Sequence, residues 1–313
     1  MNGLKAYRLQ FGLLVLALLI LAFLNISLGS VNIPISSIIK ILTGGEADKE
    51  TWQYILLNYR LPKTITAILT GSSLAVSGLL MQTLFRNPLA GPFELGISSG
   101  ASLGVAILIM GGSLLAGTGT KLATGSASLA MAASAGSFLA LLAVMVVASK
   151  IRDTMALLII GLMFGSFTAA VVSILAYFSS MEKLQQYIFW SFGSLGNLTW
   201  VQVLLFAVFS GSGLLLSIGS TKALNSLLLG ENYARSMGLS ITSSRYLIIL
   251  ATSLLAGSAT ALAGPIAFVG LAVPHLTRQL FTTSNHNVLL PAVMLYGAGL
   301  MLVCDIVAQW PFN

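Results

Sequence analysis

The charged residues best placed to do chemistry lie in one polar stretch, residues 220–245, of an otherwise apolar chain. Glu231 and Arg235 stand four residues apart in the order that favours an ion pair on a helix, and each lies near the helix end that suits its charge. Gly230 and Gly238 bracket this short helix, the second as a carboxyl-terminal cap. The stretch therefore predicts a small helical unit that presents a surface to a partner.

A second short helix precedes this unit. Leu224, Leu227 and Leu228 fall on one side of it and should hold the stretch to the rest of the chain, which leaves residues 229–239 as the contact surface. The alternative is an ordinary solvated helix, in which the Glu231 and Arg235 pair contributes about 0.3 kcal/mol.

Composition defines the elements that position this stretch. Hydrophobic residues make up 57% of the 313 residues and charged residues 7%, and long uncharged runs recur throughout. Such runs predict an all-α, polytopic helical membrane protein, because membrane strands would instead show short alternating segments. One cysteine, Cys304, excludes an internal disulfide framework, and with only His275 and His286 beside it we expect no metal site.

The hydrophobic runs predict nine spans. They cover residues 11–24, 62–85, 95–110, a run ending near 148, 155–178, 201–218, 247–263, a run ending near 281, and 288–308. The first run also fits a signal peptide, but it is long for that role and is followed by a poor cleavage site. We expect a surface-lying helix at 33–42 and an external linker at 111–128.

The net charge of +7 fits membrane orientation better than nucleic-acid binding, because the basic residues are scattered between the spans. A cytoplasmic amino terminus places nine of the fifteen Lys and Arg residues inside, against three of the eight acids. This orientation puts residues 220–245 in the cytoplasm.

The interiors of the first eight spans carry no ionisable residue, and Asp305 lies near the end of the ninth. Carriers coupled to protons or sodium ions usually need such carboxylates or broken helices, and no nucleophile with a base within reach suggests a hydrolase. The segment at 117–121 has the wrong spacing for a phosphate-binding loop. We therefore expect no enzyme activity of the chain itself, and if it moves a substrate uphill, the energy should arrive through residues 220–245.

Small and hydroxyl residues line one predicted span, the fifth. Gly161, Gly165, Ser166 and Thr168 recur at helical spacing. Tight helix packing and the lining of a substrate path explain this pattern equally well.

Four stretches carry longer motifs. They are Arg60 to Lys63 running into 71–82; Arg86, Asn87 and Pro88 followed by 95–101; Leu229, Gly230 and Glu231 with Ala234, Met237, Gly238 and Leu239; and Gly264 and Pro265 running into 266–271, with Pro274, His275 and Arg278. In order and spacing they resemble the permease subunits of bacterial ATP-binding-cassette importers for iron–siderophore, haem and cobalamin.

The resemblance implies a homodimer of ten-span subunits in the bacterial cytoplasmic (inner) membrane, with the substrate path on the dimer axis. Two cytoplasmic ATPase subunits would bind the ATP, and this chain would carry no cofactor. A substrate-binding protein would dock outside. The chain would be a single transmembrane permease domain, 1–313, that stops at Asn313 where the family continues into a tenth span.

The resemblance also assigns roles to residues. Arg60 and Lys63 would meet the binding protein, with anchoring at the membrane interface as the alternative. Gly161, Gly165, Ser166 and Thr168 would line the path. Contact with the ATPase would fall to Leu229, Gly230, Glu231, Ala234, Arg235, Met237 and Gly238.

Two signature residues have simpler interpretations. We expect Asn87 to shape its loop and His275 to act as a structural cap. A weak likeness between 71–91 and 255–270 suggests an inverted repeat. A passive channel or a secondary transporter remains the alternative function, and nothing in the sequence selects among the three substrates.

Overall fold

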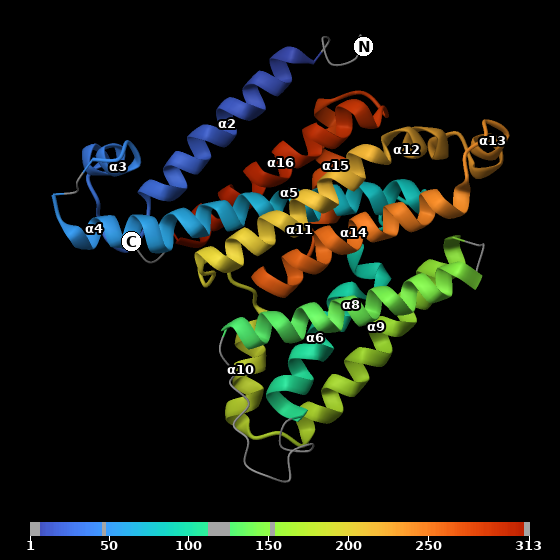
Figure 1. Ribbon diagram of the computed structural model, residues 1–313, viewed down its shortest axis with the longest axis horizontal. Helices are drawn as coiled ribbons and strands as arrows, with labels where there is room; N and C mark the ends of the chain where they lie inside the picture. Colours follow the sequence, from blue (N-terminus) through green and yellow to red (C-terminus); the bar gives the residue numbers. More distant parts are fainter. Residues whose placement is uncertain (1–6, 46–47, 112–125, 151–153, 310–313) are drawn as a thin grey trace.

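The computed structural model describes residues 7–45, 48–111, 126–150 and 154–309. Within these ranges every regular element is helical, which confirms the all-α prediction (Figure 1). In chain order the elements are α2 (Arg8–Ser27), α3 (Ile35–Leu42), α4 (Glu50–Ile55), η1 (Leu56–Arg60), α5 (Leu61–Leu84), η2 (Pro92–Leu95), α6 (Ile97–Ala106), η3 (Ile107–Gly111), α8 (Ser126–Lys150), α9 (Thr154–Tyr177), α10 (Met181–Ser191), α11 (Trp200–Gly219), α12 (Thr221–Leu228), α13 (Glu231–Ser236), α14 (Ile241–Ala263), α15 (Val269–Leu280) and α16 (His286–Gln309).

Seven helices of the described chain are long and apolar enough to cross a membrane. They are Arg8–Ser27, Glu50–Leu84, Ala127–Val144, Leu158–Tyr177, Trp200–Gly219, Ile241–Ala263 and His286–Gln309. The third and the eighth of the nine predicted spans are the shorter helices Ile97–Gly111 and α15. Each of these two helices follows a break in helical structure whose last residue, Gly96 or Phe268, has a positive φ.

The second span is longer than the sequence suggested. Its predicted start at Pro62 was wrong, because α4, η1 and α5 form one continuous helix of 35 residues. Pro62 follows directly on η1, a π-helical turn, and such turns accommodate local disruption of helix hydrogen bonding. At 1.5 Å per residue this helix is about 50 Å long, more than a bilayer core requires.

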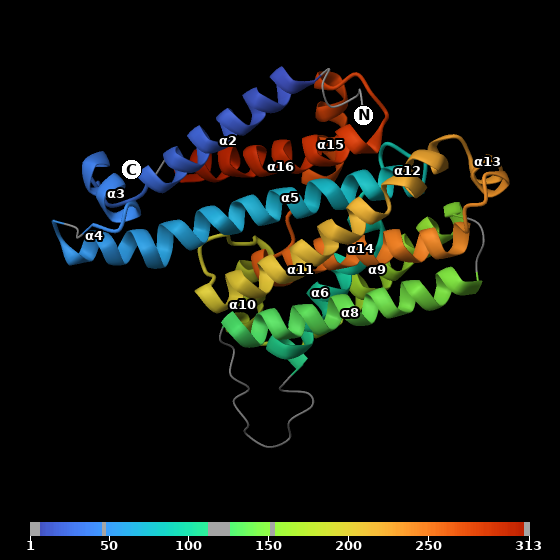
Figure 2. The ribbon, with the colours of Figure 1, turned by 45° about the horizontal axis from the view of Figure 1, so that its top comes forward.

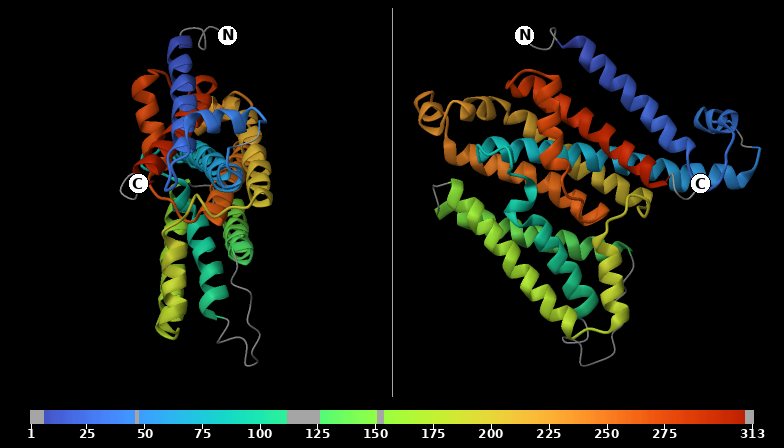
Figure 3. Two further views of the ribbon diagram at one scale, coloured as in Figure 1. Left: turned by 90° about the vertical axis from the view of Figure 1, so that its left-hand side faces the viewer. Right: turned by 180° about the vertical axis from the view of Figure 1, so that it is seen from behind.

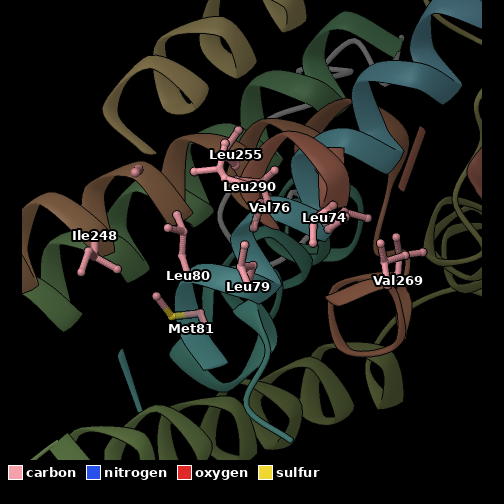
Figure 4. Packing of buried hydrophobic residues seen from close by; sticks show 14 of the residues in the cluster. Leu74, Val76, Leu79, Leu80, Met81, Ile248, Leu255, Val269 and Leu290 are labelled. Atoms are coloured by element: carbon pink, nitrogen blue, oxygen red, sulfur yellow. The ribbon is translucent and has the colours of Figure 1, made fainter. Parts of the chain in front are cut away.

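Helix α5 is the centre of the main bundle and packs against α11, α14, α15 and α16 (Figure 2). Its Leu74, Leu79 and Leu80 meet Leu255 of α14 and Leu290 of α16 in one buried cluster (Figure 4). Because lipid is as apolar as leucine, this packing stabilises the bundle through close van der Waals contact.

Glycines let neighbouring helices approach α5 closely, as predicted for this span. A side chain at Gly71 would collide with the backbone carbonyl of Gly297, and one at Gly78 with that of Gly270. Pro274 lacks the N–H that would ordinarily bond the Gly270 carbonyl, and this oxygen faces Gly78 instead.

A second group consists of α6, α8, α9 and α10, set beside the main bundle (Figure 3). Gly100 and Gly104 of α6 lie directly against the backbone of α8 at Gly136 and Ala132. The outer face of α9 is largely exposed. Much of the linker predicted at 111–128 lies outside the described residues.

The two ends of the molecule carry different elements. Helices α12 and α13 lie at the same end as the start of α2, whereas α3, α4 and the end of α16 lie at the opposite end (Figure 1). Helix α3 is amphipathic, with Ile38 and Ile41 buried and Ile35 and Ile39 exposed, as expected for a surface-lying helix.

Candidate coupling unit and its supports

The predicted helical unit exists as α12 and α13. Gly230 precedes α13 with φ of 113°, and Gly238 follows it with φ of 84°. The Leu239 N–H donates to the Ala234 carbonyl at 3.0 Å, and the Gly238 N–H donates to the Arg235 carbonyl at 3.0 Å. These two bonds form a Schellman cap, so the prediction that glycines bracket α13 is confirmed.

Burial separates the inner from the outer face of this unit. Leu224, Leu227 and Ala234 are buried in the main cluster. Leu228 is 43% exposed, so its predicted burial was wrong; as the last residue of α12, it lies about 100° around the helix from Leu227. The outer face therefore combines Leu228, Leu229 at 63% exposure, Tyr233 at 53% and Met237 at 58%.

Glu231 makes an ion pair that the sequence did not suggest. Its Oε1 lies 3.5 Å from Nη2 of Arg245, near the start of α14, whose side chain is 7% exposed. Arg235, the predicted partner, lies on the exposed side of α13. The pair with Arg245 fixes α13 to a membrane helix rather than stabilising α13 alone.

The loop after α5 contacts the carboxyl-terminal end of α12 through Arg86. Nε and Nη2 of Arg86 donate to the Leu227 carbonyl at 3.2 Å and 3.1 Å. A guanidinium at a helix carboxyl terminus satisfies unpaired carbonyls and suits the helix dipole. Asn87 Oδ1 accepts the Leu89 N–H at 2.9 Å, so Asn87 shapes the loop as predicted, and Pro88 is exposed.

Arg86 holds a backbone conformation that is costly for its type. Its φ is 48°, and the Asn87 N–H donates to the Gln82 carbonyl at 3.2 Å, which closes α5 with a cap that normally uses glycine. An arginine in the left-handed region points to a function for its side chain. Phe268, with φ of 67° and 77% exposure, is a second residue with a left-handed backbone, and its strain was not predicted.

The signature around α15 is joined to the same end of α5. Gln82 accepts a hydrogen bond from Nη1 of Arg278 at 2.7 Å and donates to the Leu271 carbonyl at 3.2 Å. Pro274 is buried inside α15, and the exposed His275 lies 3.4 Å from Gln279 on the outer face.

Gly264 ends α14 as predicted, with φ of 84°. It lies against Gly193, and the neighbouring Ser194 N–H donates to the Ala263 carbonyl at 2.8 Å. The break between Gly264 and Pro265 is therefore held by the segment that follows α10.

The four predicted path residues divide between two faces of α9. Gly161 and Gly165 face α6, where Gly165 approaches the Ser99 hydroxyl, and Thr168 is buried and bonds the Gly165 carbonyl at 2.8 Å. These three fit the packing interpretation. Ser166 lies on the exposed face, with Ile159, Leu162, Met163 and Phe167.

At the opposite end, Arg60 is 7% exposed and bonds the carbonyls of Ile26, Ser27 and Val31. It caps α2 from within the chain. Lys63 forms an ion pair with Asp305 at 3.0 Å and keeps a quarter of its side chain exposed. A cavity of about 480 Å³ opens beside Lys63 and Asp305.

Asp305 belongs to a buried network that joins three helices. It accepts hydrogen bonds from Asn25 Nδ2 and from Gln309 Nε2, each at 2.7 Å, and the Thr64 hydroxyl donates to Asn25 Oδ1 at 2.7 Å. The sequence indicated Asp305 alone. A buried asparagine in the otherwise apolar first span was the available signal for its partner.

The surface segment after α2 carries polar contacts around the exposed Asp48. Asp48 accepts a hydrogen bond from Ser37 at 2.9 Å and pairs with Lys40 at 3.4 Å. Both contacts favour the carboxylate, so they hold the pKa of Asp48 below its ordinary value.

A bundle of membrane-length helices with a supported helical pair exposed at one end is typical of a multi-pass membrane protein. The sequence matches the FecCD transport family over residues 17–313. The chain belongs to this family.

Named relatives share most of their length with this chain. It is 34% identical to the hemin transport system permease protein HmuU of Yersinia pestis, over 99% of this chain and 90% of that protein. It is 35% identical to the vitamin B12 import system permease protein BtuC of Klebsiella pneumoniae, over 97% and 86%. A solved inward-facing transporter of the metal-chelate ABC type has a TM-score of 0.83 and 30% identity, over 97% of this chain and 91% of that one. The chain is thus a permease subunit of the ABC importer class.

Proposed function

We propose that this permease carries a metal chelate, haem or a corrinoid into the cell, driven by a separate ATPase that docks on α12 and α13. The observation that carries the proposal is the contrast between the two faces of this unit. Its inner face is fixed by the Glu231–Arg245 pair and by Arg86, while four apolar side chains stand exposed on its outer face.

An apolar outer face on a fixed backbone suits a protein partner. The relatives are ABC permeases, and ABC transporters draw energy from ATPase subunits, so we assign this surface to such a subunit, which would also hold the ATP. Ala234 is buried, so its part in coupling would be to seat α13. Leu229, Arg235 and Met237 are exposed and would make the contact.

Co-purification from cells that make both subunits tests the docking role. Leu229→Asp with Met237→Asp should abolish recovery of the ATPase and stop uptake, while the permease itself still folds. Tyr54→Asp is the matched control, since Tyr54 is 60% exposed at the opposite end of the molecule. Full recovery of the ATPase with the double variant would contradict this assignment.

We further propose that the exposed face of α9 lines a path shared with a second copy of the chain. Ile159, Leu162, Met163 and Phe167 form an apolar face along this helix, and Ser166 adds a hydroxyl. Large unpartnered apolar faces are ordinary against lipid, so it is the Ser166 hydroxyl, which donates to the Leu162 carbonyl and can still accept, and the family's transport role that support this proposal.

Cysteine crosslinking distinguishes a second copy from lipid. In a Cys304→Ser background, Ser166→Cys should give a disulfide-linked species of twice the subunit mass in native membranes. Leu16→Cys on α2, at 55% exposure, should remain monomeric. Crosslinks at neither position would contradict the proposed dimer face.

At the opposite end we propose docking of a substrate-binding protein near Lys63 and Arg60. Arg60 would support the site by holding α2, while Lys63, a quarter exposed, would meet acidic side chains. This assignment needs the amino terminus and α12–α13 in the cytoplasm of an inner membrane. Reporter fusions after residue 230 should then be active only for a cytoplasmic reporter.

The substrate class follows from the relatives, which are named for hemin, vitamin B12 and metal chelates. Uptake of radiolabelled haemin, cyanocobalamin and ferrichrome, offered separately to cells lacking their own importers, identifies the substrate. Uptake of none of the three, with the ATPase and binding protein present, would contradict the proposal.

A further inference from the structure

A buried histidine joins the coupling unit to two membrane helices. His286 is the first residue of α16 and is 1% exposed. Its Nδ1 lies 2.9 Å from Asn225 Oδ1 on α12, and its Nε2 lies 2.9 Å from the Thr83 hydroxyl on α5. One imidazole thus connects α12, α5 and α16.

Neighbouring hydrogen bonds fix the direction of the contact between His286 and Asn225. Asn225 Oδ1 also accepts the His286 backbone N–H at 2.9 Å, and Asn225 Nδ2 donates to Asn285 Oδ1 at 3.1 Å. The amide is therefore oriented with its oxygen toward the ring, so Nδ1 carries the proton. In the neutral ring Nε2 is then an acceptor; the Thr83 hydroxyl lies 2.9 Å from it and 2.9 Å from the Leu79 carbonyl, and its one proton serves one of these two acceptors at a time.

Burying these polar side chains costs desolvation free energy that an apolar contact between the same helices would avoid. Each buried polar group must find a partner, and well-packed apolar side chains would hold α12 without that constraint. A set of hydrogen bonds instead fixes position and orientation, because each bond tolerates little displacement. The adjacent Gln82 extends the contacts to Arg278 of α15.

We propose that His286, with Asn225 and Thr83, is a positioning residue for energy coupling. It fixes α12 to the ends of α5 and α16, so that displacement of the docked surface moves both helices together. The inference rests on the proposed function, because it assumes that α12 and α13 receive the ATPase.

The test measures substrate taken up per ATP hydrolysed in proteoliposomes that hold the complete permease, its ATPase and its binding protein. Radiolabelled haemin, cyanocobalamin and ferrichrome serve as probes. His286→Ala and Asn225→Ala should each lower this ratio about tenfold, the effect of one unsatisfied buried hydrogen-bonding group on an equilibrium. ATPase recovery and the KM for ATP should stay unchanged.

Three further variants separate positioning from general stability. Thr83→Val should lower the ratio by removing the contact to α5 alone. His286→Asn should restore part of it, because its amide nitrogen can donate to Asn225 as Nδ1 does. Asn287→Ala, at an exposed neighbouring position, is the matched control and should behave as wild type.

The outcomes are distinguishable. If uptake falls only as the amount of assembled complex falls, with the ratio per ATP unchanged, the positioning role is refuted. If His286→Ala fails to fold, Asn225→Ala and Thr83→Val decide by the same ratio. A wild-type assembly that imports a probe without hydrolysing ATP would overturn the proposed function together with this inference.

Discussion

Arg86 offers a prediction in which backbone strain and side-chain contacts have separate consequences. Its left-handed φ of 48° is costly for arginine, while its guanidinium holds the end of α12 at the Leu227 carbonyl. Arg86→Ala removes the contact and keeps the strain. Arg86→Gly removes both.

Three contributions set the expected changes in stability. The left-handed conformation costs about 1–2 kcal/mol for a residue with a Cβ. The contact contributes about 1 kcal/mol, since Arg86 is exposed and partly hydrated. Glycine also gives the unfolded chain more conformational entropy, which lowers the stability of the folded state by about 0.5–1 kcal/mol. Arg86→Ala should therefore be about 1 kcal/mol less stable than wild type, and Arg86→Gly about equal to it.

The assay is reversible unfolding of the purified permease in mixed micelles, followed by helicity, with uptake per ATP measured on the same variants. Both variants should lower this ratio, because α12 loses its support in each. Lys222→Ala, an exposed position on α12, is the control. Equal stability of the alanine and glycine variants would refute the strain argument, and unchanged coupling in both would refute the supporting role.

Three other perturbations have clear expected results. Gly78→Ala should block assembly of the bundle, because the added methyl meets a backbone carbonyl, while Gly211→Ala, with open space around it, should melt as wild type in a thermal unfolding assay. Asp305→Leu should destabilise by about 1–3 kcal/mol by leaving Lys63 unpaired, and adding Lys63→Met should restore part of that loss in a double-mutant cycle. The contacts that lower the pKa of Asp48 stabilise the surface segment at pH values above 3.8, the ordinary pKa of the group. This contribution disappears as the pH falls through the lower pKa of the folded state. Protection of that segment from proteolysis should fall over this acid range, and Asp48→Asn should remove the pH dependence.

Local patterns predicted the features that depend on neighbouring residues. The helix type of each long apolar run, the glycine brackets of α13 and the Asn87 turn all follow from residues within a few positions of one another. The close approach at Gly71 and Gly78 was also predictable, because small residues in a membrane helix allow such contacts.

Contacts between distant segments could not be predicted in the same way. The sequence paired Glu231 with Arg235, whereas packing of α13 on α14 brings Arg245 to it. It placed Arg60 at an external surface, but the guanidinium turns inward to cap α2. His286 gave no signal, since neither of its ring partners is near it in sequence.

The unbroken helix from Glu50 to Leu84 makes the two ends of the molecule mechanically dependent on each other. It carries Lys63, in the pair with Asp305, about 20 Å from its first residue, and Thr83 in its last turn. A rod about 50 Å long that tilts by about 5° about one end moves its other end by about 4 Å. That displacement exceeds the tolerance of a hydrogen bond. A small rotation imposed at the Glu50 end would therefore change which side chains remain in contact at the Leu84 end.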